Sequence, residues 1–163
     1  MVRLSAVPMR WTDRTVQVRG RAPRVVVVDD NQSGADALAT YLELMTFSVR
    51  AAYDGMSALA LVKIWRPDIV LLDISMPELD GFEVARALRA DLDVSSAIIV
   101  ALTAHDEAHV RSRATSTEFD AYCQKGLVLE PLTRLLQILT RESVERSPLE
   151  LPYSSDGTSG PPV

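Results

Sequence analysis

The sequence has almost no cysteine and no long apolar segment. Cys123 is its only cysteine, so no internal disulfide can form and a reducing compartment is allowed. No apolar run approaches the roughly 20 residues of a membrane-spanning helix, and the N-terminus lacks the apolar centre of a signal peptide. We therefore expect a cytoplasmic protein without membrane insertion, in which Cys123 is a core residue of a strand.

Glycine-rich phosphate-binding loops are also missing, and histidine is scarce. Neither GxxxxGK(S/T) nor GxGxxG occurs, which argues against the nucleotide-binding folds that use these loops. His105 and His109 lie four residues apart, a spacing that two metal ligands on a helix can use. No third ligand is evident, so we expect surface histidines.

Charge is present but unevenly distributed. The 163 residues carry a net charge of −5, with 47% apolar and 24% charged residues, which is typical of one soluble globular domain with tails. Residues 1–24 contain six arginines and one acid, a net charge of +5, so the remaining residues carry −10. The acidic total does not suggest nucleic-acid binding. The basic start could contact an acidic partner or a membrane surface, but an unstructured extension is the simpler expectation.

The composition predicts three zones. Residues 1–22 are basic and lack a sustained period, so we expect a flexible extension in which residues 15–18 could pair as a short edge strand. Residues 23–141 alternate strand-like and helix-like segments and should form the folded domain. Residues 142–163 are rich in proline, glycine and serine and predict a disordered tail.

The middle zone contains five β/α units. Short runs of β-branched and other apolar residues predict strands over 25–28, 47–52, 69–72, 97–102 and 121–124. Helical periodicity predicts helices over 33–45, 55–65, 82–90, 106–114 and 131–141. This alternation predicts an α/β fold, with a parallel sheet, helices on both faces and right-handed connections.

Polar residues follow four of the five predicted strands. Asp29 and Asp30 follow the first strand, Asp73 the third, Thr103 the fourth and Lys125 the fifth. Each alone has an ordinary explanation, such as a turn, a helix cap or a solvated lysine. Because the carboxyl ends of parallel strands share one edge of the sheet, the whole set predicts a single crevice there.

These residue types suit one kind of chemistry. Crowded carboxylates need a cation or a raised pKa at neutral pH, and Mg²⁺ takes such oxygen ligands. A carboxylate can also attack phosphorus to form an aspartyl phosphate, whose charge a metal and a lysine balance. The hydroxyl of Thr103 can donate to a phosphoryl oxygen.

Over roughly residues 23–141 the sequence resembles the receiver domain of two-component response regulators, of the stand-alone single-domain type. The segments that carry the resemblance are 27–31, 52–59, 67–77, 80–81, 101–104 and 122–125. The resemblance implies a flavodoxin-like fold, a doubly wound five-stranded parallel sheet of order 2-1-3-4-5.

The resemblance also implies roles in phosphorelay signalling. Asp73 would accept a phosphoryl group from a histidine kinase or histidine phosphotransfer protein, and Lys125 would pair with that group. Thr103 would be the switch hydroxyl, and Tyr122 would follow it inward. The fourth helix, fifth strand and last helix would then form the surface that an unknown downstream protein reads. The chain would catalyse only its own phosphorylation and dephosphorylation and would not otherwise be an enzyme.

Mg²⁺ is the cofactor that the resemblance implies. Asp30 and Asp73 would hold it through their carboxylates, Ser75 through its backbone carbonyl, and Asp29 largely through water.

Two positions depart from the pattern of the family. Gly126 follows Lys125 where receivers usually have proline after a cis bond, so we predict a trans and more flexible Lys125–Gly126 link. Glu118 stands where a glycine commonly ends the fourth helix, and weak helix formers precede it. We therefore expect the fourth helix to fray or end early. Because this helix belongs to the signalling surface, a partner could order it; the alternative is plain sequence drift.

Other functions fit the sequence less well. A haloacid dehalogenase-like phosphatase needs a second aspartate two positions after the nucleophile, where this chain has Ser75. A phosphorylation-independent binding module and a receiver fragment of a hybrid histidine kinase are the remaining alternatives. Only 22 residues follow Arg141, too few for a helix-turn-helix domain, so we expect no direct DNA binding.

Overall fold

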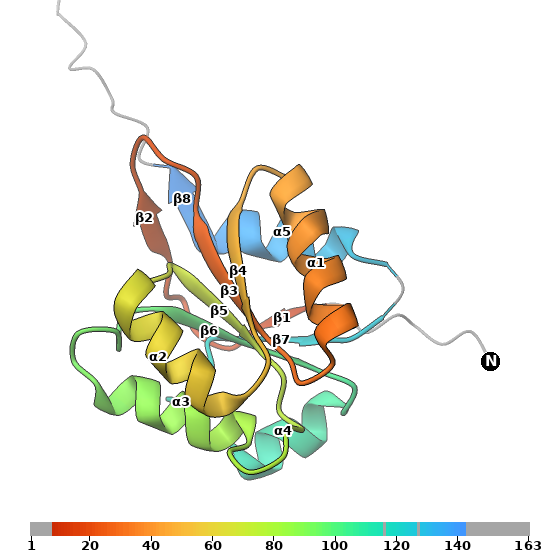
Figure 1. Ribbon diagram of the computed structural model, residues 1–163. Coiled ribbons are helices and arrows are strands. Elements are labelled where there is room, and N and C mark those ends of the chain that lie inside the picture. Colours follow the sequence, from red (N-terminus) through yellow and green to blue (C-terminus); the bar gives the residue numbers. More distant parts are fainter. Residues whose placement is uncertain (1–7, 116, 127, 143–163) are drawn as a thin grey trace, which may run out of the picture.

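The structure is a computed structural model that describes residues 8–115, 117–126 and 128–142. A central sheet lies between two layers of helices (Figure 1). The strands are β1 (Met9–Arg10), β2 (Val16–Val18), β3 (Arg24–Val28), β4 (Ser48–Ala52), β5 (Ile69–Leu72), β6 (Ile98–Thr103), β7 (Ala121–Gln124) and β8 (Thr140–Glu142). The helices are α1 (Gln32–Leu44), α2 (Gly55–Trp65), α3 (Gly81–Ala90), α4 (Glu107–Arg113) and α5 (Glu130–Leu139).

The central sheet confirms the predicted strand order. It runs β1-β7-β6-β5-β3-β4, so its five parallel strands have the order 2-1-3-4-5 when numbered along the chain. Val28 pairs with both Ala52 and Leu72, and Leu72 pairs with Ala101. The strands therefore end level with one another, and the residues that follow them lie along one edge of the sheet.

The sheet divides the core into two parts. Successive residues of a strand point to opposite faces, so Val25 and Val27 pack with α1 and α5, whereas Val26 and Val28 pack with α2, α3 and α4. All four valines are buried, and each contributes about 1.5–3 kcal/mol on burial. Burial on both faces explains why these strands are apolar throughout instead of alternating.

Side chains cap the first four helices and fix where they begin. Each N-cap side chain accepts a backbone N–H of the first turn, which stabilises a helix by about 1 kcal/mol. The caps of α1 to α4 are Asn31, Asp54, Asp80 and Asp106. The polar residues between strands and helices therefore set the length of the loops that surround the site.

Helix α4 ends early, as predicted. It covers only seven residues and stops at Arg113. Beyond it, the backbone N–H of Thr115 donates to the carboxylate of Glu118 (3.2 Å), which also pairs with Arg86 (3.4 Å). Glu118 is 2% exposed, so its side chain is buried beside the C-terminal end of α4.

Residues 8–22 differ from the flexible extension that the sequence suggested. β1 pairs antiparallel with β7 and adds a sixth strand to the central sheet. β2, within the segment 15–18 that could pair, forms a separate two-stranded parallel sheet with β8. The last helix ends at Leu139, two residues before its predicted end, because residues 140–142 pair with β2. Residues 1–7 and 143–163, which include most of the expected tail, lie outside the described residues.

Within the described part of the chain, no helix combines the length and the apolar character that crossing a membrane requires.

Candidate functional site

Four of the predicted residues meet at the carboxyl edge of the parallel strands. Asp29 follows β3, Asp73 follows β5, Thr103 ends β6 and Lys125 follows β7. The Nζ of Lys125 lies 2.6 Å from Oδ2 of Asp29 and 2.9 Å from Oδ2 of Asp73. The strands thus bring together residues that lie 52 to 96 positions apart in the sequence.

The two buried carboxylates are held by their own loops. Oδ1 of Asp29 accepts the N–H of Asn31 (3.0 Å), and Oδ1 of Asp73 accepts the N–H of Ser75 (3.2 Å). Each carboxylate therefore uses one oxygen for its loop and the other for Lys125. This arrangement fixes the orientation of both groups before any ligand binds.

Gly81 allows the loop after β5 to pack against Asp73. A side-chain carbon at position 81 would lie 2.3 Å from the carbonyl oxygen of Asp73 and 2.7 Å from the Cα of Ile74. The N–H of Gly81 donates to the carbonyl of Ile74 (2.9 Å). The glycine thus permits a close backbone contact directly beneath the phosphoacceptor candidate.

Three carboxylates form a cluster that suits a hard cation. One oxygen from each of Asp29, Asp30 and Asp73 lies within 4.8 Å of the others. Asp29 and Asp73 are buried, whereas Asp30 is exposed. Mg²⁺ prefers carboxylate oxygens and water as ligands, and the exposed Asp30 leaves one side of the cluster open to water, so the cluster fits Mg²⁺.

The electrostatics of the site follow from burial and close contact. Burial raises the pKa of Asp73, the contact with Lys125 opposes this shift, and the charge of Asp29 adds to it. Burial lowers the pKa of Lys125, but its hydrogen bonds to Asp29 and Asp73 outweigh burial, so the pKa is raised. Lys125 therefore stays protonated and carries the positive charge that two carboxylates share.

Thr103 and Tyr122 contact the same short segment behind the site. Thr103 is fully buried, and its Oγ1 accepts the N–H of His105 (3.3 Å). The hydroxyl of Tyr122 donates to the carbonyl of His105 (2.6 Å). Tyr122 is 1% exposed, and burial raises its pKa to about 12. The predicted switch residues are thus joined through one residue.

Sequence reasoning missed one contact at the mouth of the site. The Oγ of Ser75 lies 2.6 Å from Nε2 of His105, and the ring of His105 stacks on that of His109 at 4.4 Å. Both histidines are exposed, as expected. The contact joins the loops after β5 and β6, so the predicted adjacency of these strands was the available signal.

The link between Lys125 and Gly126 is trans, as predicted, since no described peptide bond is cis.

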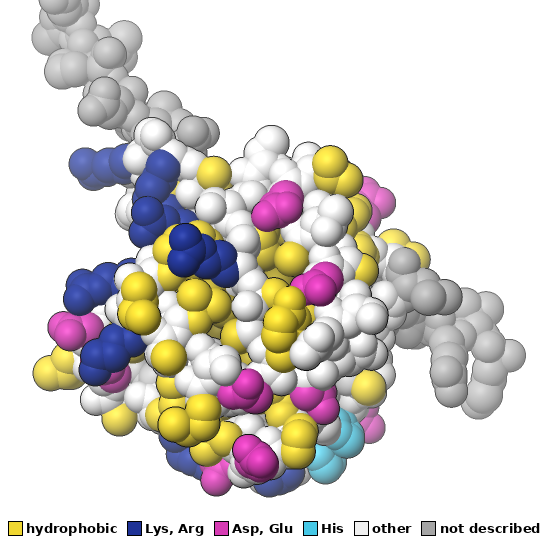
Figure 2. Space-filling view, viewed as in Figure 1, with side chains coloured by type: hydrophobic (Ala, Val, Ile, Leu, Met, Phe, Trp, Pro, Cys, Tyr) yellow, Lys and Arg dark blue, Asp and Glu magenta, His cyan; other side chains and the backbone are white. Residues whose placement is uncertain are grey.

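Acidic and histidine side chains gather near α4 on the face drawn in Figure 2, whereas lysine and arginine side chains lie mainly beside β2 and α2.

A family model and relatives of known class match this chain. The model of the response regulator receiver domain matches residues 25–137. Response regulator MprA of Mycobacterium sp. (strain KMS) is 39% identical over 126 residues, which cover 77% of this chain and 54% of that protein. Its counterpart in Mycobacterium avium (strain 104) is 37% identical over 120 residues, covering 74% and 52%.

Solved structures agree with this assignment. The response regulator protein TrrA from Thermotoga maritima, in complex with Mg(2+)-BeF, is 32% identical with a TM-score of 0.65, covering 72% of this chain and 98% of that one. Chemotaxis protein CheY4 of Vibrio cholerae is 26% identical with a TM-score of 0.68 and the same coverage, 72% and 98%.

The fold and the site therefore define a receiver of two-component signalling, and the chain belongs to the response regulator receiver domain family. A phosphoryl-accepting aspartate and Mg²⁺ are general to this family. The chain spans about half the length of the curated relatives it matches.

Proposed function

We propose that this chain accepts a phosphoryl group on Asp73 from a histidine kinase or a histidine phosphotransfer protein. The observation that carries the proposal is the bridge from Lys125 to Asp29 and Asp73, at 2.6 and 2.9 Å, on the carboxyl edge of the sheet. Asp73 is the better-placed phosphoacceptor of the pair, because the end of β5 lies between the end of β3, near Asp29, and the ends of β6 and β7, near Thr103 and Lys125. Its buried position also limits the access of water.

The transfer is a displacement at phosphorus. A carboxylate oxygen of Asp73 forms a bond to phosphorus while the bond from phosphorus to the donor nitrogen breaks, and the electron pair remains on the donor imidazole. The ammonium of Lys125 balances charge on the phosphoryl oxygens. The chain's own catalysis is limited to this transfer and to hydrolysis of the acyl phosphate.

The acidic cluster supplies the residues that would hold a metal ion. Asp29, Asp30 and Asp73 would contribute carboxylate oxygens or hold metal-bound water, and Ser75 would contribute its backbone carbonyl. Mg²⁺, when bound, neutralises negative charge on the carboxylates and the phosphoryl group.

Phosphorylation would be read through the switch residues. The hydroxyl of Thr103 would donate to a phosphoryl oxygen, and Tyr122 would be held inward beside it. The surface formed by α4, β7 and α5 would then be recognised by a downstream protein.

An intact-mass experiment tests the proposal. The wild-type chain incubated with Mg²⁺ and acetyl phosphate should gain one phosphoryl group, and EDTA should prevent the gain. Asp73→Asn should gain none, whereas Asp93→Asn, an exposed acid outside the site, should behave as wild type. A wild-type chain that gains nothing would favour the phosphorylation-independent binding module.

A further inference from the structure

We propose that residues 9–14, hereafter the strap, are an intramolecular ligand of the switch surface that binds more tightly when Asp73 is phosphorylated. The strap covers the outer edge of β7 and contacts Tyr122 and α4. The inference rests on the proposed function of Asp73. It adds that the chain's own N-terminal segment, rather than a bare β7 edge, is presented to a downstream partner.

The backbone of the strap continues the central sheet. Met9 pairs with Tyr122 and Arg10 with Ala121 in antiparallel register. The N–H groups of Trp11 and Thr12 then both donate to the carbonyl of Asp120, at 2.8 and 3.1 Å. The strap therefore forms backbone hydrogen bonds with the edge of β7, which would otherwise be open to pairing with another chain.

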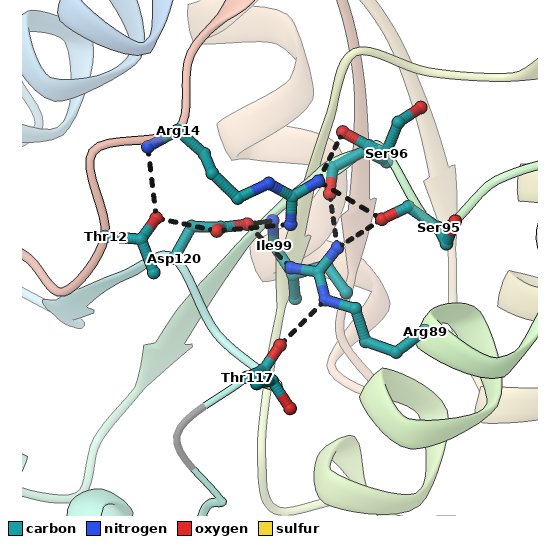
Figure 3. Close-up of polar contacts among 9 residues, drawn as sticks. Thr12, Arg14, Arg89, Ser95, Ser96, Ile99, Thr117 and Asp120 are labelled. Carbon is teal, nitrogen blue, oxygen red and sulfur yellow. Dashed lines mark hydrogen bonds and ion pairs between the residues drawn. The ribbon is translucent and has the colours of Figure 1, made fainter.

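The C-terminal half of the strap is anchored on one buried carboxylate. Oδ1 of Asp120 accepts the hydroxyl of Thr12 (2.8 Å) and a guanidinium N–H of Arg14 (3.4 Å). Oδ2 accepts Arg89 of α3 (2.6 Å) and the N–H of Ile99 in β6 (2.9 Å). Figure 3 shows Arg14 and Arg89 reaching Asp120 from different elements.

Arg14 extends this anchor to the loop before β6. Its second guanidinium nitrogen donates to the carbonyls of Ser95 and Ser96, at 3.2 and 3.0 Å. Asp120 precedes β7, at the opposite end of the strand from Lys125. The anchor is therefore remote from the phosphorylation site, so the contacts that could sense the site are those of residues 9–11.

The N-terminal half of the strap contacts the switch itself. The ring of Trp11 stacks on Tyr122, with centroids 6.0 Å apart and planes 3° apart. Its Nε1 donates to Glu107 of α4 (3.0 Å), and the guanidinium of Arg111 lies 4.5 Å from the ring centroid. Trp11 also meets Phe119 edge-on at 6.4 Å. One side chain thus joins β7 to α4.

The contacts of Trp11 lead directly to the site. The hydroxyl of Tyr122 donates to the carbonyl of His105, and the N–H of His105 donates to the hydroxyl oxygen of Thr103. The stacked arrangement requires Tyr122 to stay inward, where it is 1% exposed. A phosphoryl group that holds Thr103 and Tyr122 inward must therefore favour the docked strap, and by reciprocity the docked strap must favour phosphorylation.

Beryllium fluoride, a phosphoryl analogue that binds a carboxylate, provides a probe of this linkage. In wild type, adding it with Mg²⁺ should slow amide hydrogen exchange of residues 9–12 as well as of 121–124. Trp11→Ala should bind beryllium fluoride about fivefold more weakly, the lower range of typical coupling between linked sites. Trp65→Phe in α2, outside the strap contacts, is the matched control and should bind as wild type.

Three outcomes would overturn the inference. If exchange of residues 9–12 is the same with and without beryllium fluoride, the strap does not sense the site; this test needs no variant. If Trp11→Ala folds and binds the probe as tightly as wild type, the strap is a structural element only. If wild type binds no beryllium fluoride at all, the proposed function of Asp73 fails together with the linkage.

Discussion

The Nζ of Lys125 lies 2.9 Å from Oδ2 of Asp73, although the two residues are 52 positions apart and belong to loops after different strands. The same ammonium lies 2.6 Å from Oδ2 of Asp29. The positive charge of Lys125 therefore offsets the repulsion between the two buried carboxylates.

Lys125→Met should slow phosphorylation of Asp73 by about a hundredfold, since one preformed electrostatic donor to a developing charge is worth about that much. The measurement is the initial rate of phosphoryl incorporation from acetyl phosphate at saturating Mg²⁺. Lys63→Met removes an exposed lysine of α2 that pairs with Asp91 at 3.5 Å, away from the site, and it should leave the rate unchanged. Equal rates in both variants would remove Lys125 from the chemistry.

Asp120→Ala should lower the free energy of unfolding by about 3–5 kcal/mol, because it leaves the largely buried guanidinium of Arg89 without its carboxylate partner. Burial already lowers the pKa of Arg89, and Asp120 opposes that shift. Urea denaturation monitored by circular dichroism measures the loss. Glu130→Ala, which breaks an exposed pair with Arg134 in α5, is the control and should change stability little.

Gly81→Ala should destabilise the chain by about 1–3 kcal/mol, because its new carbon would meet the backbone of Asp73. Phosphorylation should slow as well, since Asp73 must shift. Gly126→Ala has no atom within 4 Å of the added carbon and should unfold as wild type. Urea midpoints of the two variants that agree within error would show that the loop after β5 adapts without cost.

Cys123 should resist alkylation in the folded chain. Burial raises the pKa of its thiol to about 11, so only about one thiol in a thousand is ionised near pH 8. Iodoacetamide labelling followed by mass should be at least about tenfold slower than in urea. The native rate should keep rising with pH up to about 11, whereas the rate in urea should level off near the ordinary thiol pKa. Equal rates near pH 8 would contradict the buried position.

The strand-end residues were predictable because buried parallel strands have a strong pattern. The predicted bounds of 69–72, 121–124 and 55–65 match β5, β7 and α2, and the strand order follows from the family resemblance. The pattern of these strands therefore predicts that Asp29, Asp73, Thr103 and Lys125 lie together.

The strap could not be predicted, because β1 is two residues long and exposed, and such a segment has no periodicity. Its partner β7 begins more than 100 residues later, and Trp11 acquires its role only from the position of Tyr122. β8 was missed for a similar reason. The helical pattern of the sequence continues to residue 141, but residues 140–142 are extended because they pair with β2.

Locating the phosphoryl group tests the proposed role of Asp73 most directly. Borohydride reduces an aspartyl phosphate to homoserine, so the chain phosphorylated with acetyl phosphate and Mg²⁺, then reduced and digested, can be sequenced by mass spectrometry. We expect homoserine at position 73 and aspartate at positions 29 and 30. Homoserine at position 29 or 30, with Asp73 unchanged, would contradict it.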